Sequence, residues 1–132
     1  MDKTALRHAA TTIVQRQTSK GRAVLMGQRG ASAAFMPGKF VFPGGAVDAV
    51  DETIPVSDIP PAVHTALSEE TTLPPSAIIA AAIRELWEET GHILGHRAAW
   101  PDAPKGWRGF AASGHQPNGQ ALRFFFRAIT PP

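Results

Sequence analysis

The sequence predicts a single domain of the α/β (α+β) class, with short strands arranged around one helix. Three observations predict it: short β-branched and aromatic runs, turn-forming clusters between them, and one strongly periodic segment of helix length. Glycine and proline contribute 12 residues each and gather in those clusters. With 132 residues, of which 43% are hydrophobic and 18% charged, the chain has the size and composition of one globular domain.

The N-terminal part is expected to form strands. Two apolar runs, residues 9–15 and 23–29, flank the turn-like stretch "TSKGR", and this arrangement predicts a β-hairpin. A third short strand, residues 39–42, should stop at Pro43, because proline has no amide hydrogen to donate to a ladder.

The next segment, residues 48–75, is acidic and interrupted by prolines. Its stretch "PAVHTALSEE" is compatible with a short amphipathic helix bracketed by two proline pairs. We interpret residues 52–75 as an insertion within a single domain that spans residues 1–132, and not as a second domain.

Residues 76–90 give the strongest helix prediction. Ser76 is a suitable N-cap, and Gly91 stands where a left-handed C-cap residue is favoured. The spacing of four side chains predicts one buried stripe along this helix: Ile79, Ile83, Leu86 and Thr90. Beyond the helix, "HILGH" resembles a strand. In residues 121–129 apolar side chains alternate as in a strand, with Phe124 and Phe126 expected in the core.

Composition excludes several classes of partner and chemistry. The net charge is only +2 and the basic residues are scattered, so no specific nucleic-acid surface is predicted. The absence of cysteine excludes disulfides, thiolate metal sites and cysteine nucleophiles. No secretory signal and no apolar run of membrane-spanning length is present, so we expect a soluble, cytoplasmic protein with no membrane partner.

The predicted helix carries an unusual group of acids. Glu85, Glu88 and Glu89 are three and four residues apart, so they share one face, where like charges repel. They also lie in the C-terminal half, where the helix dipole disfavours negative charge. Such local conflicts tend to mark functional sites. One interpretation is a solvated face with Arg84 paired to Glu88; the other is a site for a hard divalent cation such as Mg²⁺.

The stretch "RELWEETGH", residues 84–92, resembles the second half of the Nudix box, G-x5-E-x7-R-E-U-x-E-E-x-G-U, where U is aliphatic. His92 replaces the last aliphatic residue. In the first half Gly45 corresponds to the opening glycine, and Asp51 stands at the position of the first glutamate. Between Asp51 and Arg84 lie 32 residues instead of seven, so about 25 are inserted. With "FMPGKFVFPGGAVD", this insertion resembles the branch of coenzyme A diphosphatase "motif 19" proteins and their bacterial homologues.

The resemblance implies an α/β/α sandwich around a mixed sheet and a metal-dependent hydrolase that cleaves a diphosphate bond in a nucleoside-diphosphate-linked small molecule. It implies Mg²⁺ or Mn²⁺ bound by Glu85, Glu88, Glu89 and the carbonyl of Gly45. Asp51 would be a further ligand, with three acids of the insertion as rivals: Glu52, Glu69 and Glu70. Arg84 would orient a glutamate within the catalytic group, and Arg29 would contact substrate phosphate.

About 41 residues follow Gly91, fewer than this fold normally has, so we expect a C-terminally shortened sandwich. Residues 121–129 would then be an unpaired edge strand, or a homodimer would complete the sheet by exchange. The alternative to an enzyme is a non-catalytic Nudix-like binding module or a truncated inactive fragment, which the short C-terminus and the aspartate at position 51 favour. The three helix glutamates favour the enzyme.

Overall fold

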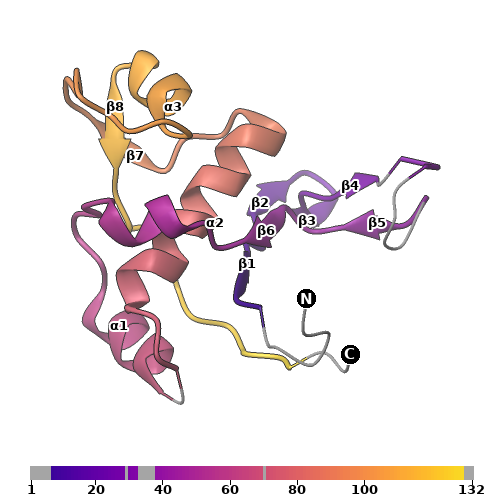
Figure 1. Cartoon of the computed structure of the whole chain (residues 1–132). Helices are drawn as coiled ribbons and strands as arrows, with labels where there is room; N and C mark the ends of the chain where they lie inside the picture. The colour runs from indigo at the N-terminus through magenta and orange to yellow at the C-terminus, as the bar shows by residue number, and fades with distance from the viewer. Residues whose placement is uncertain (1–6, 29, 33–37, 70, 130–132) are drawn as a thin grey trace.

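Helix α2 (Pro75–Thr90) runs through the middle of the helical part of the molecule, and β2 to β5 project away from it (Figure 1). The structure is a computed structural model that describes residues 7–28, 30–32, 38–69 and 71–129. The remaining elements, in chain order, are β1 (Ala9–Thr11), β2 (Gln15–Thr18), β3 (Gly21–Val24), β4 (Gly27–Gln28), β5 (Phe40–Val41), β6 (Gly44–Ala46), the 3₁₀ helix η1 (Ala49–Thr53), α1 (Pro61–Ser68), β7 (Gly95–Arg97), α3 (Arg108–Ala112) and β8 (His115–Pro117). The expected α+β class is therefore confirmed.

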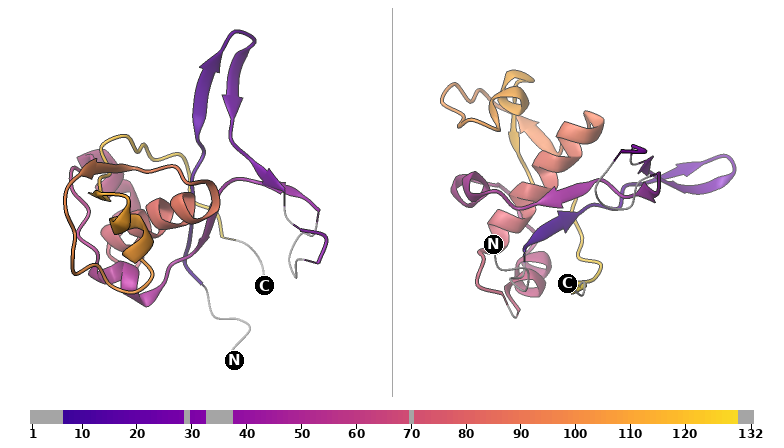
Figure 2. Two further views of the ribbon diagram at one scale, coloured as in Figure 1. Left: turned by 90° about the horizontal axis from the view of Figure 1, so that it is seen from above. Right: turned by 45° about the vertical axis from the view of Figure 1, so that its right-hand side comes forward.

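The strands pair as four short antiparallel ladders: β1 with β6, β2 with β3, β4 with β5, and β7 with β8. A hairpin, β2–β3, forms in the predicted region and extends away from the helices (Figure 2), but its strands are residues 15–18 and 21–24 and not residues 9–15 and 23–29. The first predicted run is divided, however, because residues 9–11 pair with β6. The described residues do not form one continuous mixed sheet; their parallel contact is a single bridge between Ser57 and Asn118.

Helix α2 ends as predicted and begins one residue early. Gly91 adopts φ +78° and its N–H donates to the Trp87 carbonyl at 2.8 Å, which is the left-handed cap the sequence predicted. The prediction of Ser76 as N-cap is wrong. Pro74 occupies the cap and Pro75 the first helical position, where the missing amide hydrogen costs nothing.

The core lies between α2, α1, η1 and α3. Of the predicted stripe, Ile79, Ile83 and Leu86 are buried, whereas Thr90 is exposed. The segment predicted as an insertion contributes to this core through its own helix and loops. The buried cluster comprises Ile54, Val63, Ile79, Ala80, Ile83, Ala103, Trp107 and Phe110.

The predicted strand at residues 121–129 is not formed. These residues run as an extended segment, and no described strand pairs with it. Alternation of apolar side chains is not sufficient for a strand when no neighbour supplies the ladder. Phe124 and Phe126 are 41% and 65% exposed, so their assignment to the core is wrong.

Among the helices of the described residues, none combines the length and the hydropathy that a membrane span requires.

Candidate metal centre on helix α2

Arg84 lies at the centre of a network that joins three segments of the chain. Its side chain is 4% exposed. The Nε and Nη2 atoms donate to Asp51 at 3.0 and 2.9 Å, and Nη2 also donates to the Ala46 carbonyl at 3.0 Å. Nη1 donates to Glu85 at 3.1 Å and to Glu88 at 3.2 Å. A guanidinium has five N–H donors, and each therefore has an acceptor here. The network fixes the loop after β6, η1 and the acidic face of α2 relative to one another.

Asp51 is fully buried, and both carboxylate oxygens already accept hydrogen bonds. Oδ1 accepts from Arg84 Nε at 3.0 Å and from the Trp107 indole N–H at 3.1 Å. Oδ2 accepts from Arg84 Nη2 at 2.9 Å and from the Asp48 backbone N–H at 2.9 Å. A carboxylate has about four lone-pair sites, so this one has no position left for a cation. The geometry favours Asp51 as an orienting partner of Arg84.

The two adjacent glycines of β6 permit a close approach to the helix. A Cβ on Gly45 would lie 2.5 Å from the carboxylate carbon of Glu85, so only glycine lets this side chain rest against the loop. A Cβ on Gly44 would likewise clash with the carbonyl oxygen of Ala10. The Gly44 N–H donates to Glu89 Oε2 at 3.4 Å. These two residues, 44 and 45, are called the glycine loop below, and they contact Glu85 and Glu89 directly.

Burial and charge act in opposite directions on the pKa values of the buried Arg84 and the partly buried Glu85. The hydrogen bond from Arg84 to Asp51 raises the pKa of the guanidinium, so Arg84 stays charged. Burial raises the pKa of Glu85 above its ordinary value, because desolvation penalises the carboxylate more than the neighbouring Arg84 stabilises it. A cation beside Glu85 would relieve that penalty.

The donor types at this face fit a hard divalent cation: carboxylates from Glu85, Glu88 and Glu89, and backbone oxygen from the glycine loop. Within the described residues, however, no three acidic or histidine side chains are grouped closely enough to hold an ion as they stand. Glu85 and Glu88 are both turned toward Arg84. Glu88 and Glu89 are exposed, so a change of rotamer that turned them toward an ion would break one hydrogen bond each and would not disrupt the core.

The predicted site residues thus fall into two groups. The structure brings together Arg84, Asp51, Glu85 and Glu88, with Glu89 beside the glycine loop. Arg29 and Glu70 lie outside the described residues. Trp107 was not predicted, and no periodicity or motif in the sequence singled it out.

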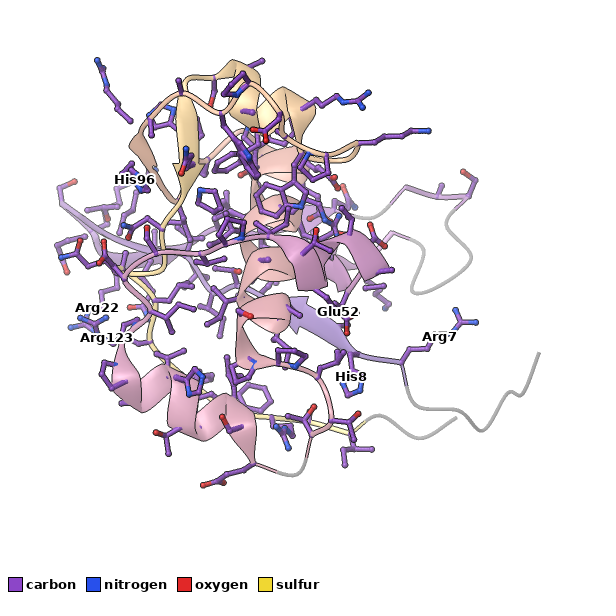
Figure 3. All side chains as sticks on the ribbon, turned by 60° about the vertical axis from the view of Figure 1, so that its left-hand side comes forward. Arg7, His8, Arg22, Glu52, His96 and Arg123 are labelled. Carbon is purple, nitrogen blue, oxygen red and sulfur yellow. The ribbon has the colours of Figure 1, made fainter. Side chains whose placement is uncertain are left out.

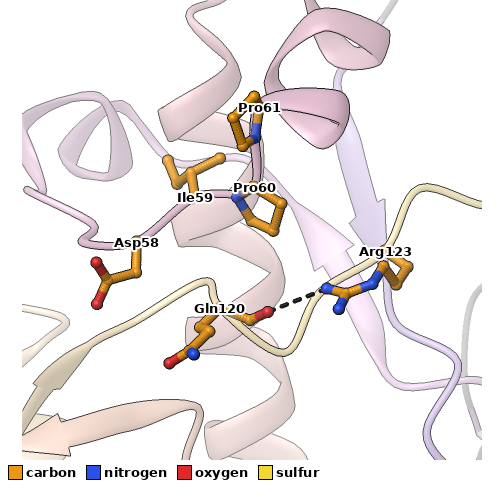
Figure 4. A pocket seen from close by; sticks show the side chains of 6 residues that line it. All are labelled: Asp58, Ile59, Pro60, Pro61, Gln120 and Arg123. Carbon is orange, nitrogen blue, oxygen red and sulfur yellow. Dashed lines mark hydrogen bonds between the residues drawn. The ribbon is translucent and has the colours of Figure 1, made fainter.

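Two hollows lie elsewhere on the surface, and neither is lined by a glutamate of α2. The larger, about 480 Å³, lies between the chain entering α1 and residues 120–123, where Arg123 donates to the Gln120 carbonyl at 3.0 Å (Figure 4). The smaller, about 310 Å³, adjoins the loop after β6 and is lined by Asp48. His8 and Glu52 are among its other lining residues, and both are labelled in Figure 3.

Comparison with known proteins agrees with this geometry. The NUDIX domain model matches residues 6–127. A Caenorhabditis elegans protein named "Putative nudix hydrolase 7" is 37% identical over 94 residues, which are 71% of this chain and 24% of that protein. The crystal structure of a NUDIX hydrolase from Alicyclobacillus acidocaldarius superposes with a TM-score of 0.70 at 28% identity, and covers 98% of this chain and 64% of that one.

The chain therefore spans about a quarter of the length of the curated relative and about two thirds of the solved one. The match nevertheless extends over nearly all of the present sequence and includes both the glycine loop and the acidic helix. On these grounds the chain belongs to the Nudix domain family.

Proposed function

We propose that the chain is a hydrolase that uses Mg²⁺ or Mn²⁺ to cleave a diphosphate bond in a nucleoside-diphosphate-linked small molecule. The observation that carries this proposal is the Arg84 network, which holds the glycine loop against an acidic helical face. Membership of the Nudix family supports the reaction class. The relatives are longer than this chain, so the activity is proposed for it and not transferred.

In this proposal Glu85, Glu88 and Glu89 bind the cation together with the Gly45 carbonyl oxygen. Arg84 orients Glu85 and Glu88 and does not touch substrate. We place Asp51 behind Arg84 and outside the ligand set, in contrast to the expectation from the motif, because its oxygens are occupied and buried.

A bound divalent cation would supply charge neutralisation at a phosphoryl oxygen and a water of lowered pKa. The chain's own contribution is positional. The glycine loop keeps bulky side chains away from Glu85, and the exposed Glu88 and Glu89 face solvent, from which the diphosphate approaches. Because no covalent nucleophile is needed, the absence of cysteine is no obstacle.

Coenzyme A derivatives come first among the substrates we propose, followed by nucleotide sugars, dinucleotides and NADH. The coenzyme A choice rests on the likeness of "FMPGKFVFPGGAVD" and the following insertion to the coenzyme A diphosphatase branch. Contact of Arg29 with substrate phosphate stays part of this proposal.

The test is product release from that substrate panel with Mg²⁺, with Mn²⁺ and with EDTA. We expect turnover with metal only, and a loss of about 100-fold or more in Glu88→Gln, because a ligand to the catalytic ion is removed. Asp102→Asn likewise replaces an exposed carboxylate by its amide, outside α2 and outside the candidate ligands, and should leave turnover unchanged. Equal rates in Glu88→Gln and wild type would contradict the assignment of the site.

The alternative, a non-catalytic binding module or inactive fragment, predicts no turnover of any substrate with either ion. The lack of a closed group of three ligands among the described residues is the observation on its side. A cytoplasmic location and a homodimer stay predictions from the sequence; fractionation and light scattering test them.

A further inference from the structure

We infer that Trp107 is a positioning residue for the metal centre, acting through Asp51 and Arg84 on the helix glutamates. The inference rests on the proposed function, because it assigns Trp107 a role in the affinity of that site for its cation. The indole N–H of Trp107 donates to Asp51 Oδ1 at 3.1 Å.

The indole is held rigidly where it meets Asp51. Trp107 is fully buried, and its backbone N–H donates to the Pro104 carbonyl at 3.0 Å. Its ring packs edge-on against Phe110 with centroids 5.2 Å apart, and tilted against Trp100 at 5.8 Å. Aromatic neighbours on two sides fix the ring plane, so the direction of the single N–H is fixed with it.

Asp51 Oδ1 accepts hydrogen bonds from two donors that belong to different segments of the chain. Trp107 precedes α3, and Arg84 Nε comes from α2. A carboxylate that is 0% exposed cannot turn to water when it loses a donor. The indole therefore restricts the rotation of the carboxylate, and the carboxylate in turn restricts the plane of the guanidinium through two bonds.

The orientation of the guanidinium plane decides where Nη1 points. Nη1 donates to both Glu85 and Glu88, and Glu88 is exposed, with little else to hold it. Partners that orient ligand side chains commonly change metal affinity by 10- to 100-fold when removed. Trp107 acts two hydrogen bonds further away than Arg84, the partner that contacts the glutamates, so a smaller loss is expected.

The experiment compares Mn²⁺ binding, measured by electron paramagnetic resonance, in wild type, Trp107→Phe and Trp100→Phe. Phenylalanine keeps an aromatic ring in the cluster but removes the donor and the volume of the second ring; Trp100→Phe makes the same change of volume at the neighbouring indole. We expect the Kd for Mn²⁺ to rise about 5- to 10-fold in Trp107→Phe and less than about 2-fold in Trp100→Phe, since no hydrogen bond joins the Trp100 indole to Asp51.

A purely structural role for Trp107 makes a different prediction. The variant would then unfold at lower denaturant concentration, yet its folded population would bind Mn²⁺ with the wild-type Kd. That result would overturn the inference while leaving the proposed function intact. If wild-type protein itself binds no Mn²⁺, the proposed function fails, and this inference fails with it.

A second measurement observes Trp107 in the wild-type protein. In wild-type protein labelled with nitrogen-15 at the indoles, the three tryptophans give three indole signals, which the single Trp→Phe variants assign. Titration with diamagnetic Mg²⁺ should shift the Trp107 signal more than the Trp100 signal, and Asp51→Asn should abolish that shift. If the Trp107 signal does not shift on addition of Mg²⁺, the coupling between Trp107 and the metal centre is contradicted.

Discussion

The side chains of Arg84 and Asp51 form an ion pair with almost no access to water, at 4% and 0% exposure. Removing two charges from water costs several kcal/mol per ion, and this cost is repaid only when all donors and acceptors are satisfied. Here every guanidinium N–H has an acceptor, and the carboxylate receives four hydrogen bonds. The pair is therefore sensitive to the loss of either partner.

We expect Arg84→Met to lower the free energy of unfolding by about 3–5 kcal/mol, because it leaves the buried carboxylate of Asp51 without its counter-charge. Adding Asp51→Asn should recover part of that loss, since the amide is neutral and its oxygen still accepts from Trp107. Urea denaturation of the two single variants and the double variant measures the coupling. If the double variant is less stable than Arg84→Met, the unpaired buried charge of Asp51 is not the cause of the loss.

Glu85 gives a prediction about pH. Burial raises its pKa in the folded state, so the protonated form is favoured by folding and the charged form is not. The folded protein is relatively favoured below the ordinary pKa of about 4.5, and this advantage is lost as the pH rises through the raised folded value. In EDTA, Glu85→Gln should therefore be more stable than wild type at pH 7, with the difference shrinking toward pH 4 in chemical denaturation. A difference independent of pH would contradict the assignment.

At the scale of the element, α2 carries Glu85, Glu88 and Glu89 in its C-terminal half, where the helix dipole disfavours negative charge. The C-terminus of the helix is stabilised by the Gly91 cap. Gly91 has φ +78°, and a Cβ there would meet nothing within 4 Å, so substitution tests backbone strain alone. We expect Gly91→Ala to destabilise the fold by about 1 kcal/mol and Gly91→Asn by less, because asparagine tolerates the left-handed region. Thermal unfolding measures both, and equal effects of the two substitutions would argue against strain as the cause.

Which elements the sequence predicts depends on whether their signals are local. The period of α2 and the glycine after it are local, and both predictions are confirmed. The start of the helix is not where Ser76 suggested, because a proline at the first helical position competes with a side-chain cap. A strand at residues 121–129 would need a partner strand elsewhere in the chain. The alternation of apolar and polar side chains cannot show whether such a partner is present, and no described strand pairs with this segment.

At the scale of the whole molecule, a cation that binds only the folded chain should stabilise all of it. At 100 times its Kd, Mn²⁺ would contribute about 2.7 kcal/mol, which corresponds to a rise in Tm of roughly 10 °C for a domain of this size. Differential scanning fluorimetry with increasing Mn²⁺ measures it. The variant Glu85→Gln/Glu88→Gln should show no rise, and an equal rise in both proteins would place the ion elsewhere.

The candidate site shows the same division between local and distant signals. The glutamates of α2 and the glycine of the loop carry a motif that is visible in the sequence. Their supports are distant: Asp51 lies 33 positions before Arg84, and Trp107 lies 56 positions after Asp51. Sequence alone offered Asp51 as a ligand, because its type and motif position allowed that role. Only the fold shows its oxygens turned inward, toward an indole that no motif marks.

These separations have a kinetic consequence. Contacts between residues 33 and 56 positions apart require large loops to close first, so they form late during folding. Substitutions at Asp51 or Trp107 should therefore increase the unfolding rate and leave the refolding rate nearly unchanged. A nascent chain would acquire its helices and hairpin early, and would become competent to capture an ion only in the final stage of maturation.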